Sequence, residues 1–450
     1  MKRKIIFLFL FAIEFEILSF NLVQEKMNNG LEVIFIENNS VPLVTIKLIV
    51  KAGAFIESDE YDGLSHLYEH MFFKANKMLP SQEDWIKYTR AHGMKWNGAT
   101  SKEYVDYYFI VHKKNLLPAI KLMYASIQSP LFDQLELEKE RKVVLSEYDD
   151  GDSDPMTVFW NEVGKKTYGK FFSYKNIIGN RKIIESATRE KLLYLRNKYF
   201  IPNNSLLIIA GDINPSKLYK KIEPIFSTWE KGGDPFAPPL PKIPKLKKDE
   251  FVLVTRDVKL ATLKLLFNGP GVFTNKEATY AADVLSYCLD HLNSTFHKEL
   301  IETGIAQSAS FGYQTFKIDG EIYFYLSLKP ENIKKALKVL KKQLAGMYDL
   351  KTYINKDLID EALSLHEIEE LYSRESSMNF ADKIGFWWSV SDIDYYFKYL
   401  ENLKKVSYSD MQSFFDTYIK KKPFVGAVLI SKEDQKKYNI DANLFEGVFK

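Results

Sequence analysis

The sequence predicts an α+β protein built from two domains whose elements follow a similar order. The chain has 450 residues, which is longer than one hydrophobic core usually supports. A stretch rich in Pro, Gly and Lys interrupts it at residues 229–250, and that composition is typical of an extended linker. We therefore expect an N-terminal domain at residues 21–228 and a C-terminal domain at residues 251–450.

The elements of each domain follow from apolar periodicity, which separates strands from helices. In the N-terminal domain, strands are predicted at residues 31–37, 41–50, 104–111 and 205–210. Helices are predicted from residues 59–63 onward and at 81–91, 116–128 and 135–149. After the linker, strands are predicted at residues 251–254, 262–267, 305–313, 322–328 and 425–430, with a helix at 278–292 and further helices before the last strand.

Composition excludes several classes of function. The net charge is +3, and acidic and basic residues are mixed along the chain. The basic patch that nucleic-acid binding needs is therefore missing, and we exclude nucleic acid as a main partner. Cys288 is the only cysteine, which excludes an intrachain disulfide and a zinc site of several thiolates. Any metal site must use His and carboxylate ligands.

The N-terminus reads as an export signal. Three basic residues at positions 2–4 precede an apolar run at residues 5–13, which is the order of a secretory signal peptide. We predict a signal peptide at residues 1–20 and an exported protein, periplasmic or membrane-associated through an uncleaved signal. The run is too short for a stable membrane span. The alternative is a first buried element of a cytoplasmic protein, since Glu14 and Glu16 follow at once.

Residues 66–70 carry His66, Glu69 and His70 in the order H-x-x-E-H. On a helix the two histidines lie one turn apart on the same face, so both imidazoles can bind one cation. A catalytic zinc typically has three protein ligands and a water, and a carboxylate beside that water acts as general base. We predict one Zn²⁺ per chain, with Glu69 activating the zinc-bound water.

The third ligand must come from elsewhere in the chain. The predicted helix at residues 135–149 offers four glutamates: Glu136, Glu138, Glu140 and Glu147. Glu140 and Glu147 are nearly two turns apart and share one face with Val143 and Val144, which indicates that this face packs inward. Spacing alone leaves Glu140 and Glu147 as alternatives.

The reversed motif is the inverzincin signature, and the chain resembles the M16 family, which includes pitrilysin, insulysin and the mitochondrial processing peptidases. Residues 138–147 resemble that family's E-R-x-x-V-x-x-E block. The family has 76 residues between its second histidine and its third ligand, and residues 71–146 give the same number between His70 and Glu147. The resemblance implies Glu147 as that ligand and Glu140 as a supporting carboxylate. It also implies LuxS/MPP-like α/β-sandwich domains, each a mostly antiparallel sheet with helices packed on one face.

The stretch Asn97, Gly98, Ala99, Thr100 and Ser101 resembles the family's N-A-x-T-S edge strand. In the family, extended substrate aligns on this strand. Main-chain hydrogen bonds to a sheet edge hold a peptide without reading its sequence. The resemblance therefore implies that residues 97–100 bind substrate, and that the substrates are peptides or unfolded segments.

The second domain departs from the family pattern. Many members carry L-R-x-x-x-G-L-x-Y there, whose Arg and Tyr reach the substrate, and this sequence has Ile301 and Gln307 at those places. We therefore expect a metallopeptidase that is the metal-bearing subunit of a clam-like dimer, in which an M16-like partner supplies the pair, a homodimer being possible. The alternatives are a non-catalytic M16-like assembly subunit and a peptide-binding module without turnover.

Overall fold

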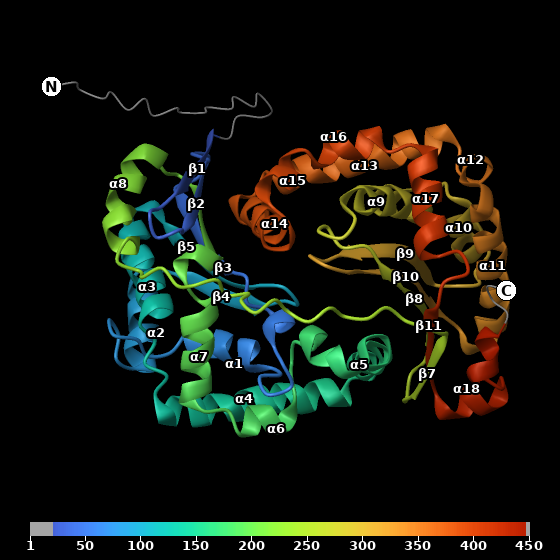
Figure 1. The fold of residues 1–450 in the computed structure, drawn as a ribbon, viewed down its shortest axis with the longest axis horizontal. Helices are drawn as coiled ribbons and strands as arrows, with labels where there is room; N and C mark the ends of the chain where they lie inside the picture. The colour runs from blue at the N-terminus through green and yellow to red at the C-terminus, as the bar shows by residue number, and fades with distance from the viewer. Residues whose placement is uncertain (1–20, 447–450) are drawn as a thin grey trace.

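Two separate sheets divide the computed structural model, which describes residues 21–446 (Figure 1). The predicted signal peptide at residues 1–20 lies outside the described residues. The strands of the first sheet are β1 Asn21–Lys26, β2 Glu32–Glu37, β3 Leu43–Val50, β4 Lys95–Thr100, β5 Val105–His112 and β6 Ser205–Gly211. Those of the second are β7 Glu250–Thr255, β8 Ala261–Gly269, β9 Ser308–Thr315, β10 Gly320–Leu328 and β11 Phe424–Ile430. Residues 227–249 between the sheets contain no helix or strand.

The two sheets share one topology. Their strand orders are β1-β2-β6-β3-β5-β4 and β7-β11-β8-β10-β9. β1 is an extra edge strand of the first sheet, which the sequence did not predict. Each of the other strands of the first sheet has a counterpart at the same place in the second. Each sheet has one parallel pair, β2 with β6 and β7 with β11, and its other pairs are antiparallel. The prediction of two similar, mostly antiparallel domains is confirmed.

Each sheet buries one face against helices from its own half of the chain. In the N-terminal half these are α1 Leu64–Phe72, α2 Gln82–Ala91, α3 Leu116–Gln128, α4 Gln134–Ser153, α6 Arg181–Glu185, α7 Arg189–Tyr199 and α8 Pro215–Phe226. In the C-terminal half they include α9 Lys276–Asp290, α10 Thr295–His297, α11 Ile333–Gly346, α12 Leu350–Tyr353, α13 Lys356–Ser373, α16 Tyr399–Lys405 and α17 Tyr408–Tyr418. Helix α18 Lys432–Lys437 follows β11 and buries none of its residues. The predicted elements therefore form, with bounds that differ by a few residues.

Helices from its own half cover one face of each sheet, as predicted, and the opposite face is covered by helices from the other half. Helices α14 Ser377–Val390 and α15 Ile393–Phe397 pack on the first sheet, whereas α5 Pro155–Tyr168 packs on the second. The strands explain this exchange, because β2 and β6 bury consecutive apolar residues, not alternate ones, and such strands need cover on both faces.

Within residues 21–446, no helix is long and apolar enough to cross a membrane. Cys288 is buried in the C-terminal core, as its apolar neighbours in the sequence predict. Trp388 also has a packing role, since it lies against the first sheet.

Candidate metal centre

The apolar side chains of α1 fix the direction of its polar ones. Leu64, Leu67 and Met71 are buried in the N-terminal core. His66 and His70 lie one turn apart on another side of the helix and retain 15% and 16% of their side-chain exposure. The helix therefore presents both imidazoles together at the border of the core.

A buried carboxylate caps the first turn of α1. The two oxygens of Glu57 accept hydrogen bonds from the backbone N–H groups of Gly63 at 2.8 Å and Ser65 at 2.5 Å. N–H groups at a helix start have no partner within the helix, so the two carboxyl oxygens satisfy donors that would otherwise be buried unpaired. Burial raises the pKa of Glu57 to about 8, although the hydrogen bonds from Gly63 and Ser65 oppose that shift. Gly63 has a φ of 95°, and a Cβ on it would come within 2.6 Å of the Gly179 Cα. The hydrogen bonds from Glu57 and the close packing of Gly63 against Gly179 therefore both fix the start of α1.

We expect Glu57→Gln to lower the free energy of unfolding by about 1–3 kcal/mol. An amide oxygen can accept one of the two N–H bonds, but the amide nitrogen then faces the other donor. The midpoint of urea unfolding measures the loss. The matched control is Glu83→Gln, an exposed glutamate in the first turn of α2, for which a change within about 0.5 kcal/mol is expected. Equal losses in both variants would show that the cap contributes nothing.

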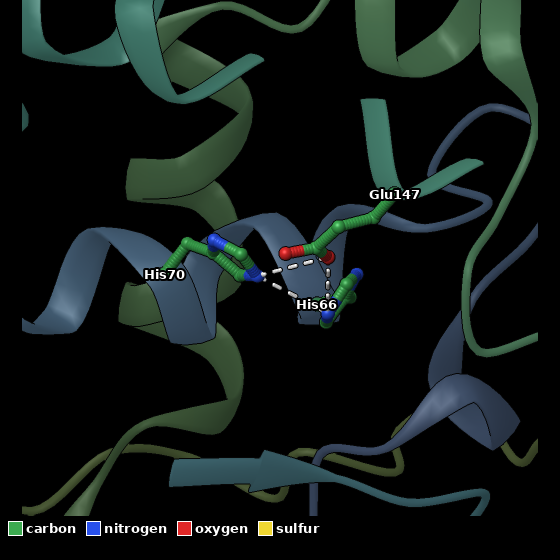
Figure 2. A group of neighbouring side chains, drawn as sticks. All are labelled: His66, His70 and Glu147. Carbon is green, nitrogen blue, oxygen red and sulfur yellow. Dashed lines mark hydrogen bonds and ion pairs between the residues drawn. The ribbon is translucent and has the colours of Figure 1, made fainter. Parts of the chain in front are cut away.

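Three side chains bring one donor atom each to a common point (Figure 2). The Nε2 atoms of His66 and His70 are 3.2 Å apart. Glu147 Oε2 lies 3.7 Å from the first nitrogen and 3.5 Å from the second. Tetrahedral zinc with bonds of about 2.1 Å holds its ligand atoms roughly 3.4 Å apart. The spacing of the three donors therefore fits zinc, and among residues 21–446 they form the one such cluster of metal-ligating side chains.

Glu140 orients the second imidazole. Its Oε1 lies 3.0 Å from His70 Nδ1, and its Oε2 lies 2.7 Å from Lys74 Nζ. Burial acts to raise the pKa of Glu140, but the hydrogen bonds from His70 and Lys74 outweigh it and lower the pKa. A carboxylate that accepts a hydrogen bond from Nδ1–H keeps the proton on that nitrogen and leaves the Nε2 lone pair free for a metal.

The electrostatics of His66 also suit a metal ligand. Burial, reinforced by the neighbouring His70, lowers the pKa of His66 to about 4. Its imidazole is therefore neutral at physiological pH. Neutral imidazole is the form that binds zinc.

We expect Glu140→Gln to weaken zinc binding by about 10–100-fold, because the partner that orients His70 loses its charge. Competition with a chromogenic chelator measures the affinity. Glu138→Gln on the same helix is the control, since its carboxylate is exposed and hydrogen-bonds only Gln134 among the described residues. Equal affinity of the two variants would contradict a supporting role for Glu140.

Glu69 and the predicted substrate strand are in contact. Glu69 is 9% exposed, and burial raises its pKa. Thr100 Oγ1 on β4 donates to Glu69 Oε2 at 3.2 Å. A Cβ on Gly98 would come within 3.0 Å of Glu69 Oε1, so the strand passes very close to this carboxylate. β4 is the last strand of its sheet, and Asn97 and Ala99 on it are exposed.

The structure thus brings the residues singled out in the sequence to one place. His66, His70 and Glu147 converge, Glu140 contacts His70, and Glu69 contacts Thr100. Two supporting residues were missed. Lys74 lies four positions after His70, so helical spacing could have found it, whereas no spacing rule connects Glu57 with α1.

The fold and this cluster define a class: a two-domain α+β protein with an inverted His-x-x-Glu-His motif on a helix beside a sheet edge. The chain belongs to the M16 peptidase family. Residues 32–179 match the family described as Insulinase (Peptidase family M16), and residues 186–364 match the one described as Peptidase M16 inactive domain. The first match contains the whole cluster, so the "inactive" description concerns the other part of the chain.

Known proteins resemble the chain over most of its length. An uncharacterized zinc protease of Rickettsia felis is 26% identical over 331 residues, covering 73% of this chain and 78% of the relative. A protease structure from Helicobacter pylori has a TM-score of 0.79 and 22% identity, and covers 91% of this chain and 99% of that one. The periplasmic protease PqqL from Escherichia coli has a TM-score of 0.77 and 14% identity, and 95% of this chain matches 49% of it. These two structures show the fold alone.

Proposed function

We propose that the chain is a zinc-dependent metallopeptidase, with His66, His70 and Glu147 as the zinc ligands and Glu69 as the general base. The observation that carries the proposal is the convergence of three donor atoms at zinc-ligand spacing beside a buried carboxylate and a sheet edge. Zinc bound there would supply Lewis acidity, which acidifies water and polarises a peptide carbonyl.

The residues then divide the remaining work. Glu69 accepts the proton of the attacking water and delivers it to the leaving amine. Its raised pKa suits both steps, because a base whose pKa is nearer to the working pH also returns the proton readily. Thr100 holds one Glu69 oxygen by its hydrogen bond, which leaves the other oxygen to accept the proton of the water.

The substrate class follows from the free edge of β4. An extended peptide that adds to this strand through residues 97–100 brings its backbone next to Glu69. A folded protein cannot supply a free extended segment. We therefore propose peptides or unfolded segments as substrates, in agreement with the exposed Asn97 and Ala99.

A partner subunit is part of the proposal. Ile301 is half-buried against the C-terminal core, and Gln307 uses its backbone N–H to bond Ser327, so neither offers the charge or hydroxyl of the family's Arg and Tyr. A second copy of this chain would again bring Ile301 and Gln307. A different M16-like subunit therefore fits better than a homodimer. The match to half the length of PqqL agrees with a chain that forms one half of an active unit.

Export is also proposed, because the N-terminus reads as a signal peptide and PqqL is described as periplasmic.

The second candidate function is a non-catalytic M16-like subunit, which the match to an inactive-domain family favours. The complete cluster of His66, Glu69, His70 and Glu147 disfavours it. Three measurements distinguish the peptidase from the non-catalytic subunit: zinc content, native mass and cleavage of a quenched peptide library. Each is made on the chain alone and after co-expression with an M16-like chain. One zinc per chain without cleavage in either preparation would overturn the peptidase proposal.

A further inference from the structure

A cavity lies between the two halves of the chain, close to the end of β4. Its volume is about 520 Å³, and helix α5 and the second sheet form most of its wall. Trp160 and Tyr323 supply aromatic surface, and Lys264 lies among them. Lys102, which lines the cavity, follows the last residue of β4 by two positions. The cavity therefore begins where the proposed substrate strand ends.

Lys264 is the unusual group of this cavity. It is 7% exposed, and its Nζ lies 4.3 Å from the centre of the Trp160 ring and 4.9 Å from that of Tyr323. Among residues 21–446 it has no hydrogen bond or ion pair. Burial lowers its pKa to about 8, so it remains mostly protonated at neutral pH. A buried ammonium normally has a carboxylate partner.

The one carboxylate that lines the cavity is already engaged. Glu321 Oε1 lies 2.9 Å from Lys102 Nζ and accepts the hydroxyl hydrogen of Tyr168 at 2.6 Å. Burial acts to raise the pKa of Glu321, but Lys102 and Lys264 outweigh it and hold the pKa at about 2. The remaining lysine, Lys175, pairs with Asp319 outside the cavity. The lining thus carries three lysines and one carboxylate. The charge of Lys264 acts on Glu321, but Lys264 makes no hydrogen bond or ion pair among the described residues, so it can receive a further anion.

We propose that this cavity is a subsite for a carboxylate of the bound peptide, with Lys264 as the charge that recognises it and Trp160 and Tyr323 as its aromatic walls. The inference rests on the proposed peptidase function and deepens it by naming a substrate preference. Lys102 lies two residues after Thr100, in the turn that connects β4 to β5, and an extended peptide advances about 3.3 Å per residue. The recognised carboxylate therefore belongs a few residues from the bond that is cut.

Peptide binding to the full-length Glu69→Gln protein, zinc-loaded and with its partner where one co-purifies, tests the proposal by calorimetry. The first probes are acetylated and amidated peptides that differ by one Glu or Gln, scanned along the chain. The second probes lack Glu and differ by a free or an amidated C-terminus. We expect about tenfold tighter binding of the carboxylate form in one of the two sets. A preference in the first set means that the cavity binds a side-chain carboxylate, and a preference in the second means that it binds the C-terminal carboxylate.

The variants locate the effect. In Lys264→Met, the preference for the carboxylate peptide over the amide peptide should fall below about twofold. Lys264→Arg keeps the positive charge and should keep most of this preference. Lys248→Met, at an exposed lysine, is the matched control and should leave the preference unchanged. Equal binding of all carboxylate and amide forms, or a preference that persists in Lys264→Met, would overturn the subsite. Because binding is measured without turnover, this result is independent of whether the chain cleaves peptides.

Discussion

Replacing Glu69 with Gln is expected to lower kcat for peptide cleavage by about 10²–10⁴-fold, the usual contribution of a general base. Gln is almost the same size and can still accept the hydrogen bond from Thr100, but it cannot take a proton from water. The proposed zinc ligands are other residues, so the zinc content should stay at one ion per chain. A quenched peptide substrate gives the rate, and atomic absorption gives the metal.

The control for this prediction is Glu60→Gln, because Glu60 is an exposed carboxylate shortly before α1. It should leave both kcat and zinc content unchanged. If Glu69→Gln lost its zinc, the fall in kcat would reflect the metal instead of proton transfer. If it kept zinc and cleaved at the rate of the unchanged protein, Glu69 would not be the base.

The sequence predicts which side chains come together at the candidate site, because their positions follow from regular spacing. His66 and His70 share a helix face by the helical repeat, and Glu140 and Glu147 do so on a second helix. The choice of Glu147 required the resemblance, since spacing left both glutamates open. In the structure Glu147 approaches the Nε2 atoms of both histidines, whereas Glu140 contacts His70 through Nδ1, the nitrogen that faces away from the cluster.

The features that the sequence did not predict depend on contacts between distant segments. The exchange of α5 for α14 and α15 has no local signal beyond the continuous apolar runs of β2 and β6. Lys264 also reads as an ordinary alternating position of a strand. Its position in a cavity becomes visible only when α5, from the other half of the chain, lies across the second sheet.

One buried ion cluster joins the two halves. Lys47 on β3 is 4% exposed, and its Nζ lies 2.6 Å from Asp106 on β5 and 2.6 Å from Asp382 on α14. Burial raises the pKa of Asp106, and Lys47 opposes that shift. The Asp382 side chain is 45% exposed, so it can turn to water, but Asp106 is 5% exposed and cannot.

We expect Lys47→Met to lower the free energy of unfolding by about 3–5 kcal/mol, because it leaves the Asp106 charge buried without a partner. Thermal unfolding at constant zinc should show a Tm lower by roughly 3–5 °C, because the unfolding entropy of a chain of 450 residues is large. Without Lys47, the pKa of Asp106 in the folded state rises further above its unfolded value of 3.8. The folded protein then loses stability as the pH rises from the unfolded-state pKa of Asp106 to its folded-state pKa. The loss of unfolding free energy in Lys47→Met should therefore be larger at neutral pH than near pH 3.8.

Two further variants identify the cause of that deficit. Lys47→Met combined with Asp106→Leu removes both charges from the β3–β5 pair and should recover most of the stability, since apolar replacements of a buried ion pair are often neutral. Lys113→Met breaks the exposed pair with Asp212 and should cost less than about 1 kcal/mol. If the double variant were no more stable than Lys47→Met, lost packing of α14 on the sheet, and not the unpaired Asp106, would account for the deficit.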